Sequence, residues 1–512
     1  MALKHRKWLA IAAFVVAPGM ARAAVRDLPL VDAVKAGDAA SVRALLTRAD
    51  VNATDVDGST AVHWAAYKEQ LEALDLLIRA GGNVKATNRY GVSPLSLACS
   101  KGNAAIIERL LVAGADPNAA LPGGETPLMT VARIGGADAL KALLAHGARV
   151  DAREATRGQT ALMWAAVAGN SAAIRALVEG GADVNLRATG PPPRPADDSS
   201  PPLAYGPVTR RVDKLTALLF AARRGQKDAV RVLLDAGANI SDVAPDGSGP
   251  VSMAIANAHY ELASFLLGKG ASATAATTGW TALHELVRTR RPSLERIAPP
   301  VGYDAASALT LAEELIAHGA DVNARMVKDV NDGYRRQEKR EGATPFFLAA
   351  KGLDAPMMRL LLAHGANPRI ATDDGTTPLM VASGFGDIAP HEAGIAEDAL
   401  AAVKVCLDAT GGDEVNAANQ AGWTALHGAA HKGSNAIVQL LVDKGAKLDA
   451  KIRLGFTPLG IATAWAGAGD NATGGDVHTQ PETMALLRQL MAARGLPTEG
   501  TEHLGRKAPL QP

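Results

Sequence analysis

The sequence has few aromatic residues, few cysteines and no excess of either charge. Aromatic residues make up 4% of the 512 residues, whereas hydrophobic residues of all kinds make up 48%, so alanine, leucine and valine must supply the core. An apolar fraction of this size excludes a disordered chain. The 53 basic and 52 acidic residues give a formal charge of +1, and that total points neither to nucleic acid nor to an anionic membrane.

The first 23 residues differ from the rest of the chain. Residues 4–7 are basic, residues 8–17 are apolar, and residues 21–23 read Ala-Arg-Ala, a small-x-small cleavage motif. We expect residues 1–23 to be a signal peptide and the exported chain to begin at Ala24. An uncleaved membrane anchor is the alternative, but a membrane-spanning helix needs about 20 apolar residues. Cleavage would leave 49 basic and 52 acidic residues, a net charge of −3.

Two classes of feature are missing from the rest of the chain. No later segment has the roughly 18 consecutive apolar residues of a membrane-spanning helix, so we expect no stable membrane insertion of residues 24–512. The two cysteines, Cys99 and Cys406, stand far apart and both occupy apolar positions of segments that we expect to be helical. Buried thiols are therefore the favoured interpretation, and a disulfide in an exported chain is the alternative.

One short pattern recurs along the chain with a nearly constant period. Its first copy, Ser59–Ala66, reads Ser-Thr-Ala-Val-His-Trp-Ala-Ala, and Val92–Cys99 follows it at a spacing of 33 residues. A fixed period of this size indicates stacked supersecondary units. We call the second residue of the pattern the cap position. The eleven copies have at this position Thr60, Ser93, Thr126, Thr160, Thr216, Gly249, Thr281, Thr344, Thr377, Thr424 and Thr457.

Each unit contains the signals of two helices and a turn. Threonine or serine at the cap position is a good N-cap, and proline often follows it, as at Pro94 and Pro127, where its missing N–H would have had no partner. The first helix is rich in alanine. The second carries a Leu-Leu pair, as at Leu76–Leu77, and stops at a glycine, which supplies a left-handed cap. A turn pair such as Asp57–Gly58 then predicts a hairpin-like finger.

This pattern resembles the ankyrin repeat, in which D-x-x-G-x-T-P-L-H-x-A-A is followed by L-L and G-A-D-x-N. The resemblance covers residues 27–497 if a degenerate first unit around Ala33–Gly37 is counted. It implies an all-α fold: a solenoid of about 12 helix-turn-helix units with short hairpin-like fingers. A single continuous array would then occupy residues 24–512, with a short tail at 498–512, in place of several globular domains. What is known of the family is mostly recognition of other proteins.

Five insertions interrupt the regular spacing, near residues 188–212, 289–305, 327–341, 385–398 and 467–481. The first is rich in proline and lengthens a finger, as does the insertion at 327–341; the other three separate the two helices of a unit. Insertions in a repeat array lie at defined edges and are candidates for function. For each of them a solvated loop without a role is the alternative.

The second long finger is basic. Arg335 and Arg336 stand beside Tyr334, and Lys339 and Arg340 follow. Because fingers of ankyrin arrays usually contact partners, Tyr334, Arg335 and Arg336 are candidate protein-binding residues.

The sequence offers no active site. His391-Glu392 has no second histidine four residues on, so it does not form the zinc motif H-E-x-x-H, and no phosphate-binding loop, nucleophile elbow or cysteine pair at metal spacing occurs. The resemblance implies that His63, His284 and His427 bond the backbone between neighbouring loops. We therefore expect no catalytic residue, no cofactor and no metal. The alternative is an enzymatic function, which would require the three interhelical insertions to form an active site together. Mutation of His391 and Glu392 would test this alternative.

The resemblance implies that the ends of the first helices line the concave face. At the seventh and eighth positions after the cap position, cations occur repeatedly and acids never. We call this set the basic track: Lys68, Lys101, Arg133, Arg223, Arg224, Arg288, Lys351 and Lys432. A positive track predicts an acidic protein partner, so the neutral total charge conceals a sorted distribution. The alternative is that these cations only complement helix C-termini.

Aromatic residues beside the cap positions complete the candidate surface. Trp280 and Trp423 directly precede a cap position and are candidate anchors for a partner. Trp64 and Trp164 fall inside the alanine-rich helix and are expected in the core. We thus predict a non-enzymatic protein-interaction scaffold without nucleic-acid binding, exported to the periplasm or, alternatively, secreted. A secreted effector or toxin-like protein that acts on a host target is the alternative function.

Overall fold

The described part of the chain is helical throughout, as the sequence predicts. Its 24 helices are accompanied by one isolated bridge between Thr54 and Thr60 and by no strand. None of these helices is both long and apolar enough to cross a membrane. The predicted signal peptide, most of the tail and the side chains of Tyr334, Arg335 and Arg336 lie outside the described residues. The computed structural model describes residues 29–190, 214–274, 279–290, 304–327, 341–386, 393–464 and 480–498.

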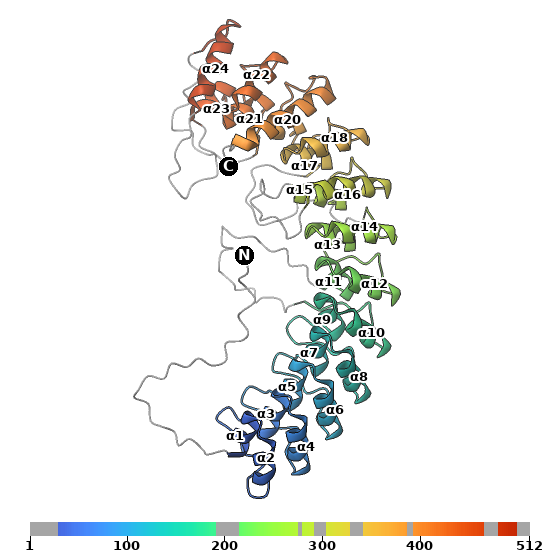
Figure 1. Cartoon of the computed structure of the whole chain (residues 1–512). Helices are drawn as coiled ribbons and strands as arrows, with labels where there is room; N and C mark the ends of the chain where they lie inside the picture. Colours follow the sequence, from blue (N-terminus) through green and yellow to red (C-terminus); the bar gives the residue numbers. More distant parts are fainter. Residues whose placement is uncertain are drawn as a thin grey trace, which may run out of the picture.

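The helices form twelve antiparallel pairs that stack into a curved array, in agreement with the predicted number of units (Figure 1). The first helix of each pair lies on the inner side of the curve and the second on the outer side (Figure 1). The inner helices are α1 (Pro29–Ala36), α3 (Ala61–Tyr67), α5 (Pro94–Lys101), α7 (Pro127–Ile134), α9 (Ala161–Ala168), α11 (Ala217–Arg223), α13 (Pro250–Ala256), α15 (Ala282–Arg290), α17 (Pro345–Lys351), α19 (Pro378–Ala382), α21 (Ala425–Lys432) and α23 (Pro458–Ala464). The outer helices are α2 (Ala39–Leu45), α4 (Leu71–Arg79), α6 (Ala104–Val112), α8 (Ala137–Ala145), α10 (Ser171–Glu179), α12 (Lys227–Asp235), α14 (Tyr260–Gly268), α16 (Ala305–Ala317), α18 (Ala355–Ala363), α20 (Ala393–Thr410), α22 (Asn435–Asp443) and α24 (Pro481–Ala492).

The inner helices begin where the capping residues place them. The hydroxyl of Ser93 accepts the N–H of Ser96 at 3.1 Å, and the hydroxyl of Thr344 accepts the N–H of Phe347 at 3.2 Å. Proline occupies the first position of α5 and of α17, where no intrahelical bond is lost. Helix α5 ends at Gly102, whose φ of 75° suits a residue without a side chain.

The core is a continuous layer of small and branched side chains between the inner and outer helices. Ala65 and Ala66 of α3 and Leu74 and Leu77 of α4 are fully buried, and equivalent residues repeat along the stack. Alanine on the inner helices lets neighbouring helices approach closely, which explains how the fold is built with few aromatic rings. Both cysteines are free and buried, as predicted, and burial raises the pKa of each thiol.

Three histidines join an inner helix to the next unit. Nδ1 of His284 accepts the N–H of Thr281 at 3.3 Å, and its Nε2 lies 3.2 Å from the carbonyl of Ala343 in the following unit. His63 and His427 make the same contacts, with Nε2 at 3.1 Å from Val92 O and 3.3 Å from Phe456 O. An imidazole that accepts at Nδ1 and donates at Nε2 is neutral. The bonding that the resemblance implied for these histidines is therefore present.

The fingers are also joined to one another. The N–H of Arg89 donates to the carbonyl of Asp57 at 2.9 Å, and the N–H of Arg453 donates to the carbonyl of Ala421 at 2.9 Å. Each bond links one finger tip to the next, so the finger edge is a connected surface. Part of the predicted insertion at 385–398 is not a loop, because α20 begins at Ala393.

Candidate interaction surface

The structure separates the basic track into exposed and covered members. Lys68, Lys101, Arg133 and Arg224 are exposed at the ends of α3, α5, α7 and α11. Arg223, Arg288 and Lys351 are half-buried, and Lys432 is buried with 7% of its surface accessible. The exposed cations therefore all lie on the stretch of the inner face from α3 to α11.

Aromatic rings lie beside these cations. Nζ of Lys101 is 4.5 Å from the centroid of the Tyr67 ring, and Cζ of Arg133 is 5.8 Å from that of Trp164. Each pair joins neighbouring units, since α5 reaches back to α3 and α7 reaches forward to α9. A cation over a ring face is held electrostatically by the ring quadrupole. The rings thus hold the Lys101 and Arg133 side chains on the inner face. A cation that only complements a helix C-terminus would not need such a contact.

The sequence reasoning missed one cation and misplaced two rings. Nζ of Lys35, on α1, lies 4.4 Å from the Trp64 ring centroid and 3.4 Å from a carboxylate oxygen of Asp55. The indole N–H of Trp64 donates to the same carboxylate at 2.9 Å. Trp64 and Trp164 are therefore half-buried, not core residues as predicted: one side of each ring packs on the core and the other meets a cation. Their position four residues after the cap was the available signal.

Two predicted contact residues are buried, which corrects the sequence-based prediction. Lys432 lies against Gly384 of the preceding unit, where a Cβ atom would stand 2.3 Å from the Lys432 Cγ. The absence of a side chain at Gly384 therefore leaves the space that Lys432 fills. Trp280 is 7% exposed, and its indole N–H donates to Glu285 at 2.5 Å. Neither side chain is available to a partner.

Trp423 remains at the surface in part. It is half-buried, and its ring centroid lies 5.3 Å from that of Phe385 and 5.9 Å from that of His427. In this aromatic group Phe385 follows α19, Trp423 ends the finger before α21, and His427 belongs to α21.

Ion pairs occupy the inner face around α15. Arg288 bonds the carboxylate of Glu285 on the same helix at 2.5 Å. Arg290, at the end of α15, is paired with Asp354, and the side chains of the two are only 8% and 1% exposed. Asp354 also caps α18 by accepting the N–H of Met357 at 3.1 Å. Here the charges of the inner helix are engaged inside the protein instead of facing a partner.

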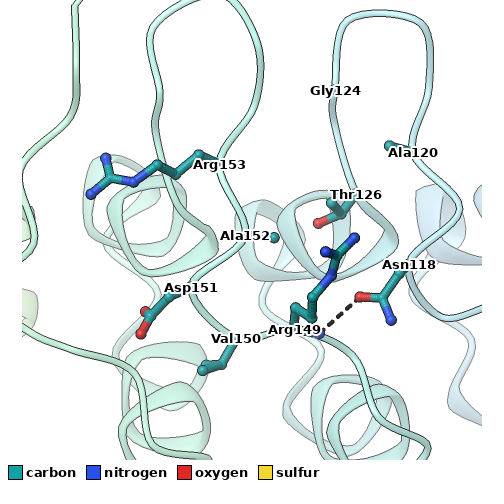
Figure 2. Close-up of a pocket in the computed structure, with 9 residues that line it drawn as sticks. All are labelled: Asn118, Ala120, Gly124, Thr126, Arg149, Val150, Asp151, Ala152 and Arg153. Atoms are coloured by element: carbon teal, nitrogen blue, oxygen red, sulfur yellow. Dashed lines mark hydrogen bonds between the residues drawn. The ribbon is translucent and has the colours of Figure 1, made fainter.

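A groove of about 600 Å³ lies between two fingers on the edge of the array (Figure 2). Arg149 extends toward Thr126 in this groove, and the Asp151 carboxylate points away from Arg149 (Figure 2). The guanidinium of Arg153 donates to the carbonyls of Gly158 and Arg187 at 2.9 and 2.6 Å. The lining residues are Asn118, Ala120, Gly124, Thr126, Arg149, Val150, Asp151, Ala152 and Arg153. The sequence reasoning did not identify this groove.

Within the part of the chain that the structure describes, no three histidine, cysteine or acidic side chains gather as a metal site would require. His391 and Glu392 fall outside that part. The described surface therefore offers contacts for a macromolecule, namely cations on rings, an aromatic group and a polar groove.

Comparison with known proteins agrees with this architecture. The family model for ankyrin repeats in three copies matches residues 30–120, 103–188, 203–277, 303–390 and 391–472. The nuclear factor NF-kappa-B p105 subunit of Gallus gallus is 31% identical over 176 residues, which are 33% of this chain and 15% of that protein. Ankyrin repeat and SOCS box protein 3 of Bos taurus is 31% identical over 138 residues, 27% of this chain and 24% of that protein.

The chain thus spans less than a quarter of the length of these curated relatives. Among solved structures, the human ASB11 ankyrin repeat domain matches with a TM-score of 0.36 and 22% identity, over 44% of this chain and 91% of that one. The matches to the family model extend over most of the sequence and reach at least one helix of every pair of the structure. This chain belongs to the ankyrin repeat family.

Proposed function

We propose that this chain is a non-enzymatic scaffold that binds an acidic segment of a protein partner on its inner face between α1 and α11. Ankyrin repeats generally mediate protein–protein interaction. The observation that carries the proposal is the row of exposed cations Lys68, Lys101, Arg133 and Arg224 along that face. No acid occupies the equivalent positions of any unit.

The charge distribution supports an acidic partner in particular. The exported chain would carry a net charge of −3, so general attraction of anions to the protein is not expected. A local positive track on such a chain speeds encounter with an acidic surface and suppresses other partners. The rings of Tyr67 and Trp164 beside Lys101 and Arg133 add apolar contact area of the kind that anchors interfaces.

A four-residue reversal, K68E/K101E/R133E/R224E, tests the proposal. The expected result is at least about ten-fold weaker binding of the partner, because each lost charge pair and each new repulsion weakens the complex. The wild-type chain is first used to capture and identify the partner, and the affinity is then measured with purified proteins. Binding of the wild type should also weaken as the salt concentration rises from about 50 to about 500 mM, because added salt screens the attraction between exposed charges.

The matched control reverses four exposed cations on outer helices, R79E/K141E/R175E/R231E. This variant carries the same change in net charge, and the surface pairs that Lys141 and Arg231 make are of the kind that contributes little. It should bind as the wild type does. If the wild type and the inner-face variant bind the partner with equal affinity, the cations of the basic track only complement helix C-termini, and the proposal is wrong.

We place this function in an extracytoplasmic compartment, the periplasm, because residues 1–23 carry the signal-peptide pattern. Expression of the full chain in a bacterial host should yield a product in the periplasmic fraction whose amino-terminal residue is Ala24. Amino-terminal sequencing of that fraction measures this. A product that retains residue 1 and stays with the cytoplasm would contradict the assignment.

A further inference from the structure

The turn that follows most of the outer helices has a recurrent hydrogen bond. Two residues after the helix-ending glycine, or after Arg48 in the first unit, a short polar side chain accepts the backbone N–H two positions further on, at 2.8–3.1 Å. This local bond satisfies a backbone donor that the turn leaves without a partner. The residues that accept in this way are Asp50, Asn83, Asp116, Asp183, Asn239, Ser272, Asp321 and Asn367.

Arg149 occupies this position in the fourth unit and cannot accept a hydrogen bond. Glu414, Lys447 and Pro497 are the other exceptions in the described chain, and Glu414 instead pairs with Arg369 at 3.8 Å. Among the described residues, neither the N–H of Asp151 nor the guanidinium of Arg149 has a hydrogen-bond acceptor. One backbone donor and one cationic donor group therefore lack partners at the same turn.

Arg149 and Asp151 both line the groove between the fingers (Figure 2). The lining also includes the small or apolar residues Ala120, Val150 and Ala152, which leave room beside the turn. The Asp151 carboxylate faces away from Arg149 in Figure 2 and accepts the N–H of Asp183 at 3.3 Å. The groove thus combines polar and small apolar residues, and none of the acceptors that line it is bonded to the Arg149 guanidinium.

We propose that this groove is a subsite for a carboxylate side chain of a polypeptide partner, which accepts hydrogen bonds from the Arg149 guanidinium and the Asp151 N–H. The ligand carboxylate would stand where an aspartate carboxylate stands in the units that carry one. The inference rests on the proposed function, since it assigns a second contact of the same kind of partner at the finger edge.

The donor set favours a carboxylate over a phosphate. The two free donor groups match the two oxygens of a carboxylate, and guanidinium–carboxylate pairs are well suited to bidentate bonding. A phosphate would bring a further negative charge toward Asp151. Burial raises the pKa of the Asp151 carboxyl, and the nearby Asp183 carboxylate raises it further, so a dianionic ligand would meet more repulsion here than a singly charged carboxylate. An aspartate or glutamate side chain fits these limits.

The test uses the full chain with two blocked tripeptides, acetyl-Gly-Asp-Gly-amide and acetyl-Gly-Asn-Gly-amide, titrated by ligand-observed NMR. The acidic tripeptide should bind at least about ten-fold more tightly than its amide twin, because charge-assisted hydrogen bonds are the stronger kind. R149N supplies the missing acceptor within the chain and removes the cation. In that variant the preference for the acidic tripeptide should disappear, while the midpoint of thermal unfolding should rise.

K447N is the matched control, since Lys447 occupies the equivalent turn position and does not line the groove. It should raise the unfolding midpoint without changing tripeptide binding. Equal binding of the two tripeptides, or equal competition by sulfate at the same concentration, would overturn the proposal. The inner-face variant K68E/K101E/R133E/R224E keeps Arg149, so loss of partner binding there with retained tripeptide preference separates failure of one proposal from failure of the other.

Discussion

Replacement of Asp354 by serine is expected to lower the free energy of unfolding by about 3 kcal/mol, because it removes the carboxylate that is bonded to the buried Arg290 guanidinium. The two side chains are 1% and 8% exposed and are bonded to each other. Serine can still cap α18 in place of Asp354, whose carboxylate accepts the N–H of Met357. The variant therefore changes the ion pair while keeping the cap.

The double variant R290M/D354S is the informative comparison. It removes both charges, and methionine can occupy the volume of the arginine stem, so it should recover at least half of the loss. The exposed pair Arg325–Asp373, with side chains 47% and 61% exposed, provides the surface control. D373S should change stability by less than about 1 kcal/mol. A loss below about 1 kcal/mol in D354S would contradict a stabilising role for the buried pair.

The readout must be local as well as global. In a repeat array each unit contacts only its neighbours, so stability is a sum of unit and interface contributions. Arg290 ends α15 and Asp354 begins α18, so the pair joins two consecutive units across the insertion between them. Hydrogen exchange measured by mass spectrometry should increase first in α15, α17 and α18. Chemical denaturation measured alongside gives the total change.

The sequence predicted those features that each unit repeats within itself. Thr344 caps α17 and Pro345 begins it, as the local pattern requires, and the same holds for Ser93 and Pro94 at α5. These positions depend on neighbours in the sequence, so a single copy of the pattern is sufficient to interpret them. Eleven copies and the degenerate first unit then predicted the stacking and the number of units.

The contacts between units were harder to predict from the sequence. Lys432 belongs to a position that is exposed in the units from α3 to α11, and it is buried because residue 384 of the preceding unit is a glycine. Arg290 and Asp354 meet across an insertion, so no fixed spacing connects them. Arg149 carried a signal in its departure from Asp or Asn at the turn, but only the structure places an open groove beside it. Where a unit departs from the repeat, the sequence pattern therefore no longer predicts which side chains are buried or paired, because packing between units determines this.

Acidification from pH 7 to pH 5 is expected to destabilise the array by about 2 kcal/mol for each of His284 and His427. Burial lowers the pKa of both to about 4, from an ordinary value of 6.5. Below pH 6.5 the unfolded chain binds a proton at each histidine, whereas the folded chain does not until pH approaches 4. Stability from these two groups is thus present above pH 6.5 and is lost as pH falls from 6.5 toward 4.

The chain itself suggests the control for this titration. Met129 and Met163 occupy the position of these histidines in two other units, and the sulfur of Met129 lies 3.5 Å from the N–H of Thr126. The variant H284M/H427M cannot titrate at either site, but it lacks the bonds from Nε2 to Ala343 and Phe456. At pH 7 it should be less stable than the wild type, by about 1 kcal/mol per lost hydrogen bond.

At pH 5 the order should reverse, because the wild type then carries the protonation penalty that the variant avoids. Denaturant midpoints measured at half-unit steps between pH 7 and pH 5 would locate the crossing. Carboxylates that titrate near pH 4 affect both proteins alike and cancel in the difference. Parallel curves for the two proteins would mean that the imidazoles titrate normally in the folded state. Crossing curves would show that each histidine joins two units only in its neutral form, which makes this part of the array sensitive to mild acid.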